Sequence, residues 1–135
     1  MVKKIFYINS EMEPFASVSN LANLSVEIPL GLQEKGNDVR CLMPKYGFIS
    51  ERKYILREVI RLREIPFSFC EGEEVASAKS AFIPKTRVQV YFLESEEWFQ
   101  PLNNLLYKSI CLIFYKLNKL VLFSPFINIF ASLPL

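Results

Sequence analysis

Two carboxylates, Glu11 and Glu13, follow the first run of β-branched and aromatic residues in the chain. Paired carboxylates can exchange a proton with a substrate as general acid and base, or they can bind a sugar hydroxyl group. The carboxyl end of a strand is also where α/β proteins bind their ligands. Both glutamates are therefore candidate site residues, and the alternative is a solvated loop without a chemical role.

A cation and an aromatic ring, Lys45 and Tyr46, follow the second run of this kind. An ammonium group beside an aromatic platform suits a sugar or a phosphate, so these two residues are candidates for the same cleft. The alternative is a surface lysine next to a tyrosine that packs on the sheet.

Two further clusters of charge are weaker candidates. A basic run around Tyr54 suits a polyanion, but interleaved glutamates cancel part of its field, so we expect a solvated strand face. Its bases are Arg52, Lys53, Arg57, Arg61 and Arg63, and its acids are Glu51, Glu58 and Glu64. The second cluster suits a divalent cation or a stacked sugar, and an exposed strand end explains it equally well. It consists of Glu94, Glu96, Glu97 and Trp98.

The composition excludes several kinds of chemistry. The chain has 135 residues and no histidine, which rules out a Ser-His-Asp triad, a Cys-His pair and a histidine metal site. Its three cysteines, Cys41, Cys70 and Cys111, form no Cys-x-x-Cys motif and suit reduced thiols in the cytosol. The net charge of +2 is too small for a surface that binds nucleic acid through its phosphates. We expect no metal, no cofactor and no nucleic-acid partner.

Five strands are predicted to position these candidates. Residues 2–8 predict a buried first strand and residues 38–43 a second, parallel one that completes a βαβ unit. Residues 59–69, 74–83 and 86–93 alternate with a period of two, and the short Pro84-Lys85 link suits an antiparallel pair. In the last strand one face is apolar, which suggests half-burial. That face consists of Val88, Val90 and Phe92.

A helix is predicted between the first two strands. Leucine and isoleucine recur there at helical spacing as one apolar stripe. The stripe consists of Leu21, Leu24, Ile28 and Leu32. Ser19 or Asn20 can cap its start, and Gly36 stands where the helix should end. Because Pro29 lies within the stripe and has no amide proton, we expect a kink or a break there.

Four segments in the N-terminal part of the chain share a family pattern. They are residues 4–16 (KIFYINSEMEPFA), Leu21-Ala22, Ile28-Pro29 and residues 36–47 (GNDVRCLMPKYG). Together, and without a gap, they resemble the N-terminus of bacterial glycogen synthases and plant starch synthases. That family has a strand ending in Ser-Glu, then Pro-Phe-Ala, a Lys-x-Gly-Gly-Leu loop, a helix with Leu-Pro, and a Gly-His-Asp-Val-Arg strand ending in Met-Pro-x-Tyr-Gly. Residues 43–63 and 87–99 look closer to a divergent branch in Bacteroidetes-like bacteria. The resemblance covers about residues 3–100.

The resemblance implies a fold, a reaction and a binding loop. Family members transfer glucose from ADP-glucose to the end of an α-1,4-glucan in a cleft between two Rossmann-like domains, without a required metal. In the family, the lysine of the loop reaches the nucleotide-sugar phosphates, and its two glycines let backbone amides approach them. Here Ser17 stands at the lysine, and Ser19 and Asn20 stand at the glycines. We therefore expect a degenerate loop that does not clamp ADP-glucose.

The last part of the chain has a different composition. Residues 1–101 are predicted to be the N-terminal part of a starch synthase catalytic domain, and residues 102–135 a hydrophobic tail with three lysines and no acid. Residues 120–135 are too short for a spanning helix, so a membrane segment is disfavoured. An amphipathic helix over residues 105–122 is a second alternative. We favour a third, in which the chain has left the reading frame of the family.

The sequence thus predicts an α/β fold, a partial Rossmann-like N-terminal domain with a βαβ unit followed by antiparallel strands. We expect a cytoplasmic N-terminal fragment of an ADP-glucose-dependent glucosyltransferase that is inactive alone and has no assigned catalytic residue. Its substrate residues would be Ser17, Ser19 and Asn20, with Glu11, Lys45 and Tyr46 in the cleft. An open sheet edge would favour self-association. The alternatives are a non-catalytic module that binds glucan or a partner subunit, and a small membrane-associated protein.

Overall fold

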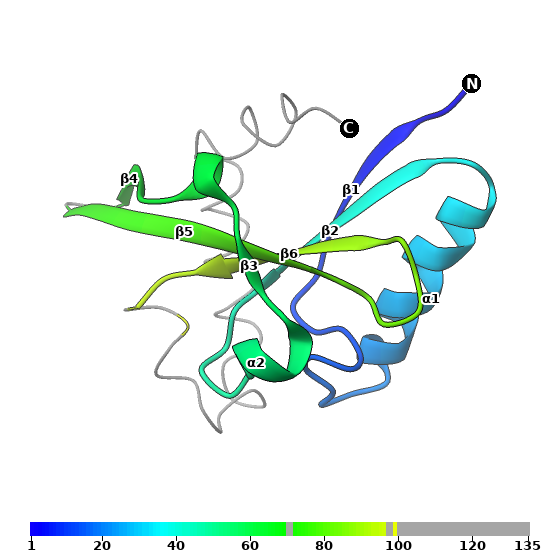
Figure 1. Cartoon of the computed structure of the whole chain (residues 1–135), viewed down its shortest axis with the longest axis horizontal. Helices are drawn as coiled ribbons and strands as arrows, with labels where there is room; N and C mark the ends of the chain where they lie inside the picture. Colours follow the sequence, from blue (N-terminus) through cyan, green and yellow to red (C-terminus); the bar gives the residue numbers. More distant parts are fainter. Residues whose placement is uncertain (70–71, 97–98, 100–135) are drawn as a thin grey trace.

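The computed structural model describes residues 1–69, 72–96 and 99 (Figure 1), and its central feature is one mixed sheet. Within these residues the sheet has six strands, ordered β1-β2-β6-β5-β3, with β4 paired to β5. The strands are β1 (Lys4–Ile8), β2 (Asp38–Pro44), β3 (Arg57–Glu58), β4 (Ile65–Phe69), β5 (Gly72–Phe82) and β6 (Gln89–Glu94). The predicted tail and the predicted candidates Glu97 and Trp98 lie outside the described residues.

The pairing of the strands confirms the predicted fold class. Strands β1, β2 and β6 run parallel, and β5 is antiparallel to β6, β3 and β4. The βαβ unit is present, because α1 (Leu21–Glu34) connects β1 to β2. The Pro84-Lys85 link joins β5 to β6 as predicted, since the Thr86 amide bonds the Ile83 carbonyl across it at 3.0 Å.

Helix α1 begins and ends as predicted but does not break at its proline. Asn20 is the N-cap residue, although its side chain makes no capping bond, and the Ser19 hydroxyl accepts from the Leu21 amide instead. Gly36 follows the last turn with φ +81°, a conformation that glycine adopts without steric cost. The helix continues through Pro29, whose buried ring packs inside the molecule.

The face of α1 that meets the rest of the protein differs from the apolar stripe in the sequence. The buried positions are Ala22, Ser25 and Pro29. Leu21, Leu24 and Ile28 are instead 37%, 50% and 44% exposed. Small side chains let the helix approach closely, and the Glu13 amide donates to the Ala22 carbonyl at 3.3 Å. The periodicity therefore identified the helix correctly and its buried face wrongly.

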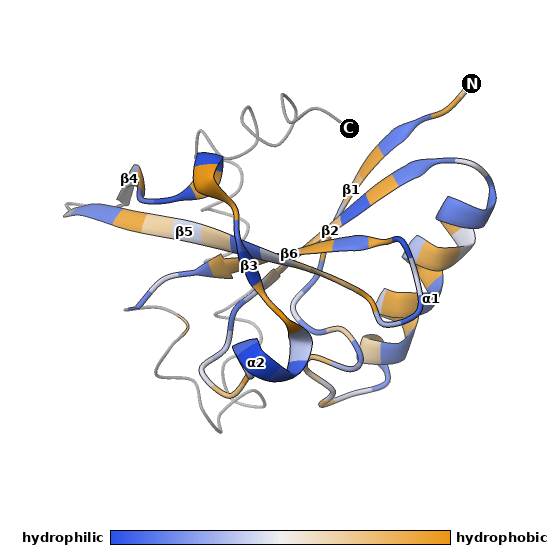
Figure 2. Cartoon of the chain, viewed as in Figure 1, coloured by the Kyte–Doolittle hydropathy of each residue, from blue (hydrophilic) through white to orange (hydrophobic). Residues whose placement is uncertain are grey.

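The segment after β2 is more broken than the single strand predicted over residues 59–69. It contains the short helix α2 (Glu51–Tyr54), β3, a 3-10 turn η1 (Ile60–Leu62) and then β4. The prediction was wrong because Glu64 adopts φ +50° and interrupts the extended chain; its amide donates to the Ser77 hydroxyl at 3.0 Å. The basic run is solvated but does not form one strand face, and Figure 2 shows α2 as a hydrophilic element.

The core lies on both sides of β6, which is therefore more buried than predicted. Tyr91 and Leu93 are buried as well as Phe92, because β6 lies between β2 and β5. The Phe15 ring packs edge-on against Phe92 at 4.9 Å and against Tyr54 at 4.8 Å. Such aromatic pairs add about 1 kcal/mol each beyond the area that they bury. They attach the loop after β1 to the sheet and to α2.

Strand β1 is half-buried rather than buried. In the described part of the chain it pairs with β2 alone, so its other edge has no strand beside it. Unpaired edges offer backbone groups to other chains, which keeps the prediction of self-association open.

Candidate functional site

The carboxyl ends of β1, β2 and β6 meet at one edge of the sheet, because these strands are parallel neighbours. The pairing continues into the segments that follow. The Asn9 amide bonds the Leu42 carbonyl at 3.0 Å, and the Lys45 amide bonds the Leu93 carbonyl at 2.8 Å. The predicted cleft candidates follow β1 and β2 directly, so this edge brings them together.

Glu11 holds the loop that precedes α1. Its carboxylate accepts from the Val18 amide at 2.9 Å and from the Ser19 amide at 3.2 Å. The Ser19 hydroxyl also donates to it. Glu11 is only 1% exposed, so the alternative of a solvated glutamate is wrong. Backbone amides that point at a carboxylate form the same kind of anion cradle that phosphates use. In this loop the cradle is filled by a side chain of the protein itself.

The other residues of the loop are exposed. The Ser17 hydroxyl donates to Glu13 at 2.9 Å, which places a carboxylate beside the position of the family lysine. Asn20 lies on the surface at the start of α1. Ser17 and Asn20 can offer hydrogen bonds to a ligand, but neither supplies a positive charge.

Tyr46 fastens the two loops to each other. Its hydroxyl donates to the Ser10 carbonyl at 2.7 Å, and its ring is fully buried and stacks on Phe48 at 5.5 Å. Burial raises the pKa of the Tyr46 hydroxyl, and the negative charge of Glu11 adds to the effect. The phenol therefore stays neutral, and the packed tyrosine of the alternative interpretation is what the structure contains.

Lys45 is neither a surface lysine nor a free cation. It is 4% exposed, and its ammonium group lies 2.9 Å from Glu51 and 3.1 Å from Glu94. Lys79 contacts the same two carboxylates at 2.7 Å and 3.5 Å. These four residues form a charge network that ties the end of β2 to α2, β5 and β6.

The network shifts the pKa values of its members. Burial alone would lower the pKa of Lys45, but its hydrogen bonds to Glu51 and Glu94 and their charges outweigh it and raise the pKa. Hydrogen bonds from Lys79 and Lys45 lower the pKa of Glu51. All of these charges are therefore compensated inside the protein, which leaves Lys45 bound to carboxylates rather than available to a phosphate.

Three buried polar side chains at the start of the loop and on α1 have no hydrogen-bond partner among the described residues. Asn9 and Ser10 are 3% and 1% exposed, and within the described residues their side chains make no hydrogen bond. Ser25 on α1 is in the same state. Burial of such groups costs about 1–3 kcal/mol each. Buried polar side chains therefore lie at the end of β1 and on α1.

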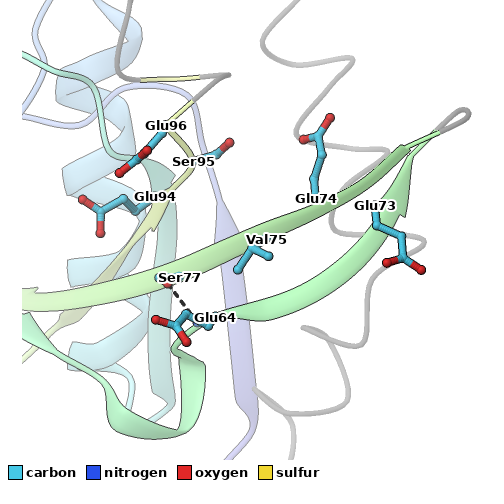
Figure 3. A pocket seen from close by; sticks show the side chains of 8 residues that line it. All are labelled: Glu64, Glu73, Glu74, Val75, Ser77, Glu94, Ser95 and Glu96. Atoms are coloured by element: carbon cyan, nitrogen blue, oxygen red, sulfur yellow. Dashed lines mark hydrogen bonds between the residues drawn. The ribbon is translucent and has the colours of Figure 1, made fainter.

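An acidic pocket of about 420 Å³ lies next to the network (Figure 3). Its carboxylates point in different directions, and Glu94 among them is held by Lys45 and Lys79. The lining is Glu64, Glu73, Glu74, Val75, Ser77, Glu94, Ser95 and Glu96. In the described part of the chain no three acidic, cysteine or histidine side chains are grouped to hold a metal ion. The cation or sugar site suggested for Glu94, Glu96, Glu97 and Trp98 includes two residues outside the described ones and stays a prediction.

Two residues of this edge had no role in the sequence-based interpretation. Lys79 was part of an ordinary strand, and Tyr54 was only an aromatic within a basic run. Tyr54 donates from its hydroxyl to the Pro14 carbonyl at 2.8 Å and so holds the loop from the side of α2. The pairing of opposite charges on neighbouring strands would have been the only signal for Lys79.

The sheet and its βαβ unit form part of a Rossmann-like α/β domain. The fold resembles the catalytic domain of starch synthase IV from Arabidopsis thaliana, solved bound to ADP and acarbose, with a TM-score of 0.60 and 22% identity. The match covers 70% of this chain and 18% of that one. At this identity the similarity shows the fold alone.

Sequence comparison identifies the family. The family model described as "starch synthase catalytic domain" matches residues 4–127, and the chain belongs to that family. The chain is 38% identical over 97 residues to a glycogen synthase of Chlorobaculum parvum and 36% identical to one of Chlorobium limicola. Each match covers 72% of this chain and 20% of the relative. The predicted resemblance to glycogen and starch synthases is confirmed.

The chain spans about 20% of the length of the curated relatives, and the family match extends past residue 101, so the division into residues 1–101 and 102–135 stays a prediction. Among the described residues, no helix combines the length and the apolar character needed to cross a bilayer.

Proposed function

We propose that this chain supplies part of the N-terminal domain of a glucosyltransferase that moves glucose from ADP-glucose to an α-1,4-glucan, and that it does not catalyse the reaction alone. The observation that carries the proposal is the loop of residues 17–20, which Glu11 holds at the carboxyl ends of the parallel strands. This is the position at which α/β proteins bind ligands. Family membership supports the same assignment.

The charge at this edge argues against activity of the chain alone. Charge that develops on a departing diphosphate must be neutralised by cations and donors placed beforehand. Ser17 stands where the family has a lysine, and Lys45 is already held by Glu51 and Glu94. The Val18 and Ser19 amides are bound to Glu11. The donors that a diphosphate would need are therefore replaced or occupied.

The experiment restores the loop of the family. Ser17→Lys, Ser19→Gly and Asn20→Gly together should bring saturable ADP-glucose binding, measured by ligand-observed NMR, at least about tenfold tighter than in the unmodified chain. Ser17→Lys alone is the matched control, because it adds the charge without the two glycines. No gain in the triple variant contradicts the assignment of the loop. Incorporation of labelled glucose into glycogen by the unmodified chain contradicts its inactivity.

Binding of the unmodified chain to glycogen without incorporation of labelled glucose would favour the second candidate, a non-catalytic module that recognises glucan or a partner subunit. The internally occupied amides of the loop support this candidate too. A cytoplasmic location is part of both proposals, and the buried free thiol of Cys41 agrees with a reducing compartment.

A further inference from the structure

A second pocket is lined by residues from α2, from β3 and from the end of β5 and the turn that follows it. Figure 1 shows these three elements near one another. Its volume is about 380 Å³, within the range of small-molecule sites. The residues that give it chemical character are Lys53, Tyr54, Arg57, Ser80, Phe82 and Pro84. Arg57 and Ser80 are paired positions on neighbouring strands, so the sheet register fixes them beside each other.

The pocket combines positive charge with apolar surface. Lys53 and Arg57 line it and make no ion pair within the described residues, and the lining includes no carboxylate. Phe82 is 60% exposed, although large aromatic side chains are usually covered. Tyr54 contributes its ring, with the Lys53 ammonium 5.0 Å from the ring centroid.

The two acids near these cations in the sequence, Glu51 and Glu58, are not among the residues that line the pocket. Glu51 begins α2, but its carboxylate is held by Lys45 and Lys79. The positive charge of the pocket is therefore not cancelled by its own helix, unlike the charge of the basic run as a whole. An anion that enters would meet two cations and the Ser80 hydroxyl in a pocket that the Phe82 ring also lines.

We propose that this pocket is a binding site for a small organic anion in which a flat ring carries a phosphate or a carboxylate. Lys53 and Arg57 bind the charged group, and Phe82, Tyr54 and Pro84 cover the ring. Tyr54 also bonds the Pro14 carbonyl and packs on Phe15, so an occupied pocket contacts the same ring that holds the loop after β1. This site is separate from the loop of residues 17–20 and does not depend on the proposed function.

The test uses the full chain and two probes, phenyl phosphate and phenylacetate. At least one of them should give saturable NMR shifts of the backbone amides of residues 53–57 and 80–82. Inorganic phosphate and phenol should each bind at least about tenfold more weakly, because each lacks one half of the ligand. The better of the two probes shows which charged group the site prefers.

Three variants distinguish binding in this pocket from non-specific binding of an anion to a basic surface. Arg57→Gln and Lys53→Gln should each weaken binding about tenfold, the usual loss for one charged hydrogen bond. Arg61→Gln is the matched control, because this substitution removes the same charge from an exposed position. Arg61 lies on η1 and does not line the pocket. Equal weakening by Arg61→Gln, equal binding of inorganic phosphate and phenyl phosphate, or no saturable shift with either probe overturns the proposal.

Discussion

Glu11 binds Ser19 at two points, the backbone amide and the side-chain hydroxyl, and thereby fixes the start of α1 against the end of β1. A buried carboxylate that accepts several hydrogen bonds is costly to replace, since each donor left behind loses its partner. Glu11→Gln should therefore lower the free energy of unfolding by about 2 kcal/mol, measured by urea denaturation. Glu13→Gln is the control. The Glu13 side chain is exposed and, among the described residues, its carboxylate accepts one hydrogen bond, from Ser17, so equal losses would refute this role of Glu11.

The charge network around Lys45 predicts how stability depends on pH. The pKa of Glu51 is lowered on folding, so its contribution is present above its unfolded pKa near 4.5 and is lost as pH falls through the lower folded value. The pKa of Lys45 is raised, so its contribution is complete below about 10.5 and is lost as pH rises through the higher folded value. Stability should form a plateau between these limits. Glu51→Gln should flatten the acid side of the curve, and an unchanged acid side would contradict the assignment.

Removal of the buried member of the network should cost more than removal of an exposed charge. Lys45→Met leaves Glu94 without its nearest cation and Glu51 with Lys79 alone, and we expect a loss of about 3 kcal/mol in urea denaturation. Lys85→Met, at an exposed position in the turn between β5 and β6, is the control for loss of one positive charge. Similar losses for both variants would show that the ion pairs of Lys45 do not contribute to the free energy of unfolding.

Ile55 adopts a left-handed backbone conformation, φ +52°, directly after α2, and its side chain is 69% exposed. A β-branched residue is strained there, whereas glycine is not. Ile55→Gly should therefore raise the melting temperature, with a gain of about 0.5–1 kcal/mol. Ile60→Gly is the matched control, since Ile60 is 87% exposed and its φ is not positive. It should lower stability, and a gain there equal to that of Ile55→Gly would exclude strain as the cause.

Ser25 offers a stabilising change inside α1. Its hydroxyl is buried and has no hydrogen-bond partner among the described residues, and alanine favours the helix more than serine does. Ser25→Ala should raise the free energy of unfolding by about 1 kcal/mol. Ser50→Ala tests the opposite sign, because the Ser50 hydroxyl accepts from the Lys53 amide at the start of α2. A loss in Ser25→Ala would mean that the hydroxyl is satisfied.

The sequence predicted elements whose signals are local. Pro44 and Gly36 mark the ends of β2 and α1, and periodicity marks their interiors. It could not predict which side of α1 meets the protein, since a stripe of large apolar residues shows only that they share a face. The interruption at Glu64 also had no local signal, because glutamate rarely adopts a positive φ.

The positions of the cleft candidates on the sheet were predicted, whereas their burial and their bonding partners were not. Glu11, Lys45 and Tyr46 lie at the expected edge, because the carboxyl ends of parallel strands always coincide. Their burial depends on partners far away in the sequence. Tyr46 bonds Ser10, and Lys45 bonds Glu94 across 49 positions of the chain. Spacing alone contains no information about such pairs.

The long strand β5 has different neighbours along its length, so its two parts should differ in how readily they open. Residues 77–82 pair with β6, which is buried on both faces, whereas residues 72–76 pair with β4. Amide protons in the first group should exchange with deuterium only when the whole sheet opens, and those in the second when the hairpin of β4 and β5 separates by itself. One strand therefore belongs to two cooperative units, and the boundary between them falls at Ala76 and Ser77.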